Sequence, residues 1–274
     1  MSNLFFSIDK YRIHYRYYTA DNNNAIIILV HGHGEHSGRY EPWASEFNQY
    51  NYAVCALDLP GHGLSSGQRG HIRHYDDYYK VLDEFIEKVR LDFPSKPIIL
   101  YGHSMGGNIC CSYVLDCRPE IKALILSSPW LELAIKPSVF RFWLAKTMYR
   151  IFPAFGDATN LNPNYISHIP EEVARYKNDP LVHDKITPGL FIPMFFKGLK
   201  NINEGRKINL PTLVFHGSGD QLTSHKASFK FSETSDKISF QLYPDGYHEL
   251  HHDLCKEELR DHILDWMSSN IIMR

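Results

Sequence analysis

The segment Pro97-Ile-Ile-Leu-Tyr-Gly-His-Ser-Met-Gly106 joins a short apolar run to a serine that is bounded by glycines. Gly102–Gly106 matches the pattern Gly-x-Ser-x-Gly, in which small residues permit a sharp, strained turn that lifts the serine hydroxyl above a sheet. Pro97–Tyr101 is predicted to be the strand before this turn, and Gly106–Cys117 the helix after it. Ser104 is therefore a candidate nucleophile at the end of a buried strand.

Strand and helix patterns alternate along most of the chain on either side of this turn. An alternating segment at Tyr11–Tyr18 is predicted to pair with Leu4–Ile8 as a hairpin, and a helical pattern covers Tyr75–Leu91. This alternation predicts an α/β fold, with a mostly parallel sheet and helices on both faces. The other predicted strands are Ala25–Val30, Tyr52–Leu57, Ala123–Ser127, Thr212–His216 and Ile238–Tyr243.

The alternation is interrupted once, by about eighty residues without a clear strand between Ser128 and Pro211. Such a segment is too long for a loop inside a compact domain, so we predict a helical cap inserted over the sheet. The expected organisation is an α/β core of residues 1–134 and 209–274, with residues 135–208 as the cap. Aromatic residues make up 14% of the chain and are conspicuous in this segment.

The composition of the 274 residues excludes several classes of protein. With 29 Lys and Arg against 31 Asp and Glu, the net charge is only -2, so no nucleic-acid partner is expected. No apolar run approaches the roughly 20 residues that span a membrane, and the N-terminus lacks a signal-peptide pattern. The five cysteines do not suggest a disulfide framework. We expect a cytoplasmic protein with reduced thiols and no cofactor.

A nucleophilic serine needs a histidine base and a carboxylate that orients this base, in the chain order Ser, Asp or Glu, His. Asp220 and His248 each follow a predicted strand, and the carboxyl ends of parallel strands share one edge of a sheet. We therefore expect both to meet Ser104. Asp245 competes with Asp220 but is too near His248 in the sequence to be preferred. Ser65 lies in a second Gly-x-Ser-x-Gly match that has no strand before it, so it is predicted to be a loop residue.

The reaction of such a serine also needs donors for the developing oxyanion. Met105 follows the nucleophile and supplies one backbone N–H at the start of a helix. The loop after Ala25–Val30 reads His31-Gly-His-Gly34, and its glycines allow close approach of the backbone. The backbone N–H of His33 is the expected second donor.

A rival motif begins at the candidate base. The segment His248-Glu-Leu-His-His252 reads H-E-x-x-H, which on a helix would bind zinc. Pro244 and Gly246 precede it and place His248 in a loop, and no third ligand follows at the expected spacing. A zinc peptidase is therefore disfavoured, and no metal is expected.

Five motifs along the chain together resemble one known family: His31–Tyr40, Asp58–Ser65, Gly102–Gly107, Asn178–Val182 and Tyr243–Glu249. The resemblance is to the monoacylglycerol lipase family, a lysophospholipase-like branch of the α/β-hydrolases, and it covers nearly the whole chain. It implies an α/β-hydrolase fold with a helical lid, Ser104, Asp220 and His248 as a catalytic triad, and His33 and Met105 in the oxyanion hole. His33 departs from the family, which usually carries a small residue there.

The expected function is hydrolysis of monoacylglycerols to glycerol and fatty acid by a serine esterase. Lysophospholipids, simple carboxylic esters and thioesters stay open as substrates, because one fold supports many chemistries. A catalytically silent lipid-binding protein is a more distant alternative. The sequence leaves the oligomeric state open.

The predicted cap contains a basic amphipathic segment, Ser138–Phe155, which is suited to a membrane surface. Two interpretations are open: transient membrane contact through the cap, which would make the protein peripheral to a membrane, or packing of these side chains onto the sheet. The residues in question are Val139, Phe142, Trp143, Tyr149, Phe152 and Phe155, placed among Arg141, Lys146 and Arg150.

Overall fold

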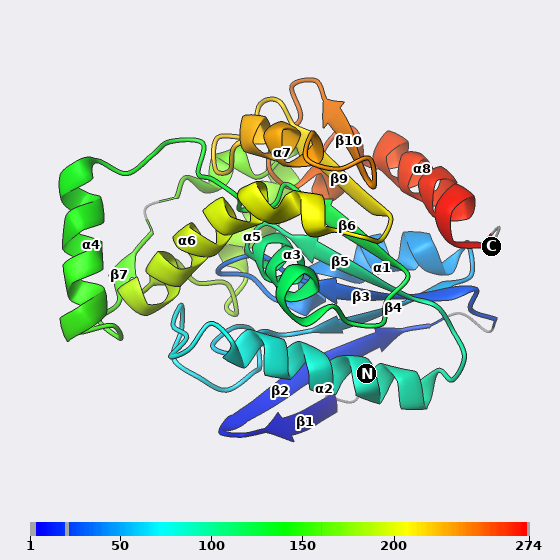
Figure 1. The fold of residues 1–274 in the computed structure, drawn as a ribbon, viewed down its shortest axis with the longest axis horizontal. Helices are drawn as coiled ribbons and strands as arrows, with labels where there is room; N and C mark the ends of the chain where they lie inside the picture. Colours follow the sequence, from blue (N-terminus) through cyan, green and yellow to red (C-terminus); the bar gives the residue numbers. More distant parts are fainter. Residues whose placement is uncertain (1–3, 20–21, 160, 273–274) are drawn as a thin grey trace.

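The structure, a computed structural model, describes residues 4–19, 22–159 and 161–272. Its centre is an eight-stranded sheet in the order β1-β2-β4-β3-β5-β6-β9-β10 (Figure 1). β2 pairs antiparallel with β1 and with β4, and the strands from β4 to β10 are parallel to one another. The strands are β1 (Leu4–Ile8), β2 (Tyr11–Tyr18), β3 (Ala25–Val30), β4 (Tyr52–Leu57), β5 (Ile98–His103), β6 (Ala123–Ser127), β9 (Thr212–Gly217) and β10 (Ile238–Tyr243).

The central strands are buried on both faces, which explains their continuous apolar runs. Every residue of β3, β4, β5, β6 and β9 is buried. The predicted hairpin of β1 and β2 and the predicted α/β class are confirmed. β5 extends beyond the predicted Tyr101, because Gly102 and His103 still pair with β6. The sheet therefore carries the chain right up to Ser104.

Helices cover the two faces of the sheet and form two cores. The side chains of α1 and α8 pack on one face, and those of α2, α3 and α7 pack on the other. These helices are α1 (Glu41–Asn48), α2 (Asp77–Asp92), α3 (Met105–Cys117), α7 (His225–Ser232) and α8 (Lys256–Met267). Short helical turns lie at Ser37–Tyr40, Pro163–Tyr165, Gly205–Lys207, Leu250–His252 and Ser268–Ile272.

Besides short helical turns, the described residues between β6 and β9 form three α-helices and a small two-stranded sheet. These elements are α4 (Val139–Ile151), β7 (Asp157–Ala158), α5 (Pro170–Asn178), β8 (Lys185–Ile186) and α6 (Pro188–Glu204). The helices α6 and α4 differ in packing. α6 buries Leu190, Met194 and Ile202 in the core that it shares with α3, whereas α4 buries no residue. Figure 1 shows α4 apart from the sheet and α6 crossing beside α3. The boundaries of the predicted cap stay a prediction.

Candidate active site

Ser104 connects β5 to α3 in a backbone conformation that few residues other than glycine adopt. Its φ is 52° and its ψ is -114°, a strained geometry of the kind found at nucleophile turns. Gly106 allows the close approach that this turn requires, because a Cβ there would lie 2.2 Å from the carbonyl oxygen of Val30. Glycine at position 106 thus lets α3 begin beside the end of β3 and places Ser104 at the carboxyl edge of the sheet.

Asp220 and His248 meet at the same edge in a short hydrogen bond. Asp220 follows β9 and His248 follows β10, and the Nδ1 atom of His248 lies 2.7 Å from Oδ2 of Asp220. The other carboxylate oxygen accepts the backbone N–H groups of Leu222 and Thr223, at 2.7 and 3.1 Å. A ring nitrogen that faces a carboxylate carries the proton, so Nε2 of His248 is the atom free to act as a base.

Charge outweighs burial in setting the pKa values of this pair. Burial raises the pKa of Asp220, but the charge of His248 and hydrogen bonds from His216 and His248 hold it well below the usual value. Burial lowers the pKa of His248, but the charge and hydrogen bond of Asp220 hold it above its usual value. Asp220 is therefore ionised at neutral pH and stabilises a protonated His248.

The rival residues of the sequence analysis lie in other settings. Asp245 is exposed, and its backbone N–H donates to Ser218. Ser65 is buried, and its hydroxyl donates to the carbonyl oxygen of Asp58 at 2.6 Å and accepts the backbone N–H of His14 at 2.9 Å. These bonds tie two backbone segments together, so Ser65 has a structural role as the prediction of a loop residue implied.

The loop after β3 is held in place by the side chain of Glu35. One oxygen of this carboxylate accepts the backbone N–H of Gly32 at 2.6 Å and the hydroxyl of Tyr40 at 2.7 Å. His33 lies inside the loop, and burial lowers its pKa to about 3, so its imidazole is neutral at physiological pH. Met105 is fully buried at the start of α3. The oxyanion-hole roles of His33 and Met105 stay predictions.

Arg39 links this loop to the loop that carries His248. Its guanidinium donates to Glu35 at 2.6 Å and to both oxygens of Glu249 at 2.6 and 2.7 Å. The Arg39 charge holds the pKa values of both carboxyls below their usual values, against the effect of burial. No motif in the sequence predicts this network. The spacing of four residues between Glu35 and Arg39, just before a helix, was the one local signal of it.

Backbone hydrogen bonds join the segment between β6 and β9 to both of these loops. The N–H of His183 donates to the carbonyl oxygen of Gly34 at 2.8 Å. The N–H of Glu249 donates to Ile166 at 2.8 Å, and that of His248 to Tyr165 at 3.3 Å. The segments that precede and follow α5 therefore support both loops directly.

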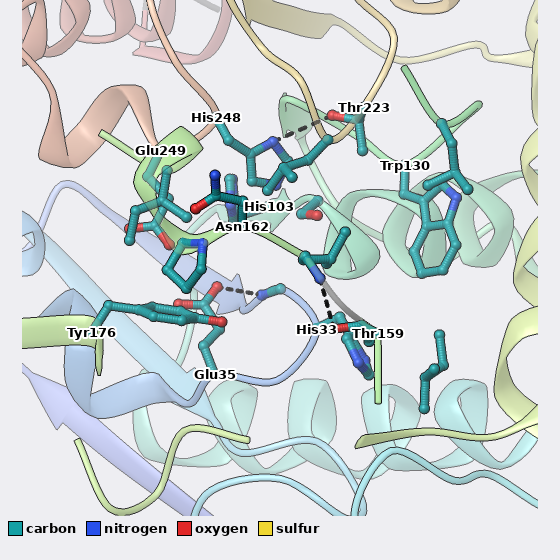
Figure 2. Close-up of a pocket in the computed structure, with 18 of the residues that line it drawn as sticks. His33, Glu35, His103, Trp130, Thr159, Asn162, Tyr176, Thr223, His248 and Glu249 are labelled. Carbon is teal, nitrogen blue, oxygen red and sulfur yellow. Dashed lines mark hydrogen bonds between the residues drawn. The ribbon is translucent and has the colours of Figure 1, made fainter. Parts of the chain in front are cut away.

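A cavity of about 220 Å³ is lined by Ser104 and His248. Figure 2 shows its lining, with His248 and Glu249 among the labelled side chains. Its polar lining includes Glu35, Thr159 and Glu249. The remainder is mostly apolar. The polar side chains can therefore orient a polar group, and the apolar side chains can contact a hydrocarbon chain. The large apolar side chains in the lining are Trp130, Leu133, Leu161, Ile166, Ile186, Phe191 and Leu222.

The H-E-x-x-H segment does not form the helix that a zinc site of that kind needs. His248 lies in a loop and bonds Asp220, and a short 3₁₀ turn begins only at Leu250. Among the described residues, Glu249, His251 and His252 are close enough together to be considered as ligands. The Glu249 carboxylate, however, already accepts Arg39 and Nδ1 of His252, at 2.9 Å. A cation there would have to displace a buried guanidinium, so the residues fit a metal poorly.

The chain is similar to known proteins over nearly its whole length. A family model described as serine aminopeptidase, S33, matches residues 21–255. The chain is 30% identical over 271 residues to the monoacylglycerol lipase of Mycolicibacterium smegmatis, which covers 97% of this chain and 96% of that relative. It superimposes on the crystal structure of Paleococcus ferrophilus monoacylglycerol lipase with a TM-score of 0.86 and 31% identity, over 94% of this chain and 99% of that one.

A third relative is much longer than this chain. An uncharacterized abhydrolase domain-containing protein of Dictyostelium discoideum is 33% identical over 252 residues. The match spans 90% of this chain and 26% of that protein.

Within the described part of this chain, none of the helices combines the length and apolar character that crossing a membrane demands.

Proposed function

The chain belongs to the α/β-hydrolase family described as serine aminopeptidase, S33, in its monoglyceride-lipase-like branch, and on that premise we propose that it hydrolyses monoacylglycerols. Membership of this branch makes it a carboxylic ester hydrolase. The proposal adds the substrate, a glycerol ester of one fatty acid, and the residues that act on it.

In the proposed mechanism, Nε2 of His248 takes the proton of the Ser104 hydroxyl as its oxygen attacks the ester carbonyl. The backbone N–H groups of His33 and Met105 stabilise the oxyanion. Asp220 stabilises the protonated His248, which then gives its proton to the leaving glycerol oxygen. Water activated by His248 hydrolyses the acyl-enzyme, releases the fatty acid and restores the serine.

The charge at the polar end of the cavity is the observation that favours a neutral head group. Glu35 and Glu249 are the charged residues in the described lining, which includes no lysine or arginine. Arg39 pairs with both carboxylates and supplies one positive charge. Glu35, Glu249 and Arg39 together therefore keep one net negative charge. A neutral glycerol head group meets no charge repulsion there, whereas an anionic phosphodiester would meet like charge.

We expect kcat/KM for a monoacylglycerol to exceed that for the lysophosphatidylglycerol of the same acyl chain, whose head group has a net charge of about -1, by about 10- to 100-fold. At about 8 Å and an effective dielectric constant of about 20, two like unit charges repel by about 2 kcal/mol, which corresponds to a factor of about 30. Initial rates over several chain lengths measure this ratio. The methyl ester of each fatty acid serves as a control without a polar head group.

The same panel separates the alternatives. A ratio of one or less would identify a lysophospholipase, and equal turnover of methyl ester and monoacylglycerol would identify a general carboxylesterase. No turnover of any ester, together with no reaction with a fluorophosphonate probe, would indicate a silent lipid-binding protein.

We also propose that residues 135–208 act as a lid whose outer helix, α4, contacts the membrane from which substrate is taken. Val139, Phe140 and Trp143 are 87%, 69% and 61% exposed. Arg141 and Arg150 lie on the same helix and suit an anionic lipid surface. Phe142 differs from these residues, because its ring packs against Phe195 of α6 at 4.7 Å between centroids.

The double substitution Phe140→Glu and Trp143→Glu is expected to weaken binding to anionic vesicles at least about tenfold, because each large apolar side chain contributes about 1.5–3 kcal/mol when buried. Turnover of a water-soluble short ester should stay within about twofold of the parent. Leu91→Glu is the matched control, since Leu91 is 82% exposed and belongs to α2, which lies apart from α4 (Figure 1). Vesicle sedimentation measures binding. Equal loss of vesicle binding and of soluble-ester turnover would instead indicate ordinary packing.

A further inference from the structure

A second histidine contacts the carboxylate that holds the proposed base. His216 lies in β9 and is fully buried, and its Nε2 atom is 2.9 Å from Oδ2 of Asp220. This is the same oxygen that faces Nδ1 of His248 at 2.7 Å. Asp220 thus lies between two imidazoles, of which the proposed mechanism uses only one.

The surroundings of His216 settle which of its nitrogens carries a proton toward Asp220. Because Nε2 faces a carboxylate oxygen, it must be an N–H donor. The Nδ1 atom lies 2.9 Å from the hydroxyl of Ser228 in α7, and in the neutral ring it accepts the proton of that hydroxyl. Ser228 therefore holds the tautomer in which His216 donates to Asp220.

We propose that His216 is a positioning residue that acts on the base through Asp220, a role that rests on the proposed triad. By donating a hydrogen bond to Oδ2, His216 stabilises part of the negative charge of the carboxylate. The same hydrogen bond holds this oxygen next to Nδ1 of His248. An Asp220 shared in this way stabilises protonated His248 less than an unshared one would. His248 then stays a free base down to a lower pH.

Other groups also face His248 and have to be held constant in any test. His103 lies 4.8 Å away between ring centroids, and the carboxylates of Glu35 and Glu249 add their charge. The Thr223 hydroxyl lies 3.3 Å from Nδ1 of His248 and also 2.9 Å from Oδ2 of Asp220. Substitution at position 216 leaves His103, Glu35 and Glu249 in place. Thr223 loses one contact, because its hydroxyl also lies 3.3 Å from Nε2 of His216, and it loses this contact in both variants.

The test compares His216→Gln with His216→Asn. A glutamine amide nitrogen takes the position of Nε2 and can still donate to Asp220, whereas an asparagine amide takes the position of Nδ1 and reaches only Ser228. The readout is the pH dependence of the second-order rate of reaction with a fluorophosphonate probe, which reports protonation of the base. Both variants lose the imidazole, so a purely structural effect would act on both.

We expect the acid limb of the pH–rate profile to move to higher pH by about 0.5 to 1 unit in the Asn variant. When Asp220 loses the hydrogen bond from position 216, its carboxylate stabilises protonated His248 more strongly. The limb of the Gln variant should stay within about 0.2 unit of the parent. Coincident limbs for all three proteins would overturn the proposal, whatever happens to their melting temperatures.

Two further variants keep the outcome interpretable. If either substitution at position 216 prevents folding, Ser228→Ala replaces it. The ring then loses the hydroxyl at Nδ1 that supports its donation to Asp220, so the acid limb should rise by a smaller amount. An unmoved limb in that variant also overturns the proposal. Ser104→Ala is run in parallel: labelling of this variant would refute the triad itself, while no labelling together with coincident limbs would refute only the role of His216.

Discussion

Replacing Ser104 with alanine is expected to reduce hydrolysis of a monoacylglycerol by about 10⁴- to 10⁶-fold, the range found when a nucleophile is removed from a catalytic triad. Fold and stability should be preserved. The φ of 52° at this position strains alanine no more than serine, since both carry a Cβ. Initial rates on a monoacylglycerol and labelling by a fluorophosphonate probe measure the loss, and thermal unfolding checks the fold.

Ser65→Ala is the matched control, because Ser65 is the serine of the second Gly-x-Ser-x-Gly match. Its hydroxyl bridges the backbone of Asp58 and His14, so its removal should cost about 1–3 kcal/mol of the free energy of unfolding. Turnover by folded Ser65→Ala should stay within a few-fold of the parent. Ordinary turnover or labelling in the Ser104 variant would refute the assignment of the nucleophile.

The strands of this fold could be predicted because a strand that is buried on both faces has a continuous run of apolar residues. Ala25–Val30 and Tyr52–Leu57 were predicted with the bounds that the structure gives. The contact between Asp220 and His248 was also expected, since parallel strands bring the residues that follow them to one edge. Their catalytic roles stay predictions, as does that of Ser104.

The contacts that were missed are those between segments distant in sequence. Arg39 and Glu249 are 210 residues apart, and no periodicity in one segment indicates a charged partner in another. His216 was read only as the end of a predicted strand, because alternation indicates burial but not which polar partner a buried ring finds. In the insertion, apolar periodicity did not distinguish α6, which packs against α3, from the exposed α4.

Arg39 offers the second large effect, because it pairs with both Glu35 and Glu249, whereas the other partner among the ion pairs of the described residues, His252, contacts Glu249 alone. The side chains of Arg39 and the two glutamates are between 3% and 7% exposed. Arg39→Met is therefore expected to lower the free energy of unfolding by about 3–5 kcal/mol at pH 7, since it leaves two buried carboxylates without their counter-ion. Chemical denaturation measures this loss. Arg175→Met is the matched control, because Arg175 pairs with Glu172 at the surface with 61% of its side chain exposed, and its loss should cost less than about 1 kcal/mol.

The loss in Arg39→Met should also depend on pH, with a sign that identifies its origin. In the parent, the pKa values of Glu35 and Glu249 are lowered, so their contribution to stability is present above the pKa of about 4.3 that an unfolded Glu has. It disappears as the pH falls through the lower folded values. Without Arg39, burial raises both pKa values instead, and each carboxyl destabilises the fold above about pH 4.3. The difference between parent and variant should therefore shrink steadily from pH 7 toward pH 4. A difference that stays constant over this range would mean that lost packing of the Arg39 side chain, and not unpaired charge, accounts for the destabilisation.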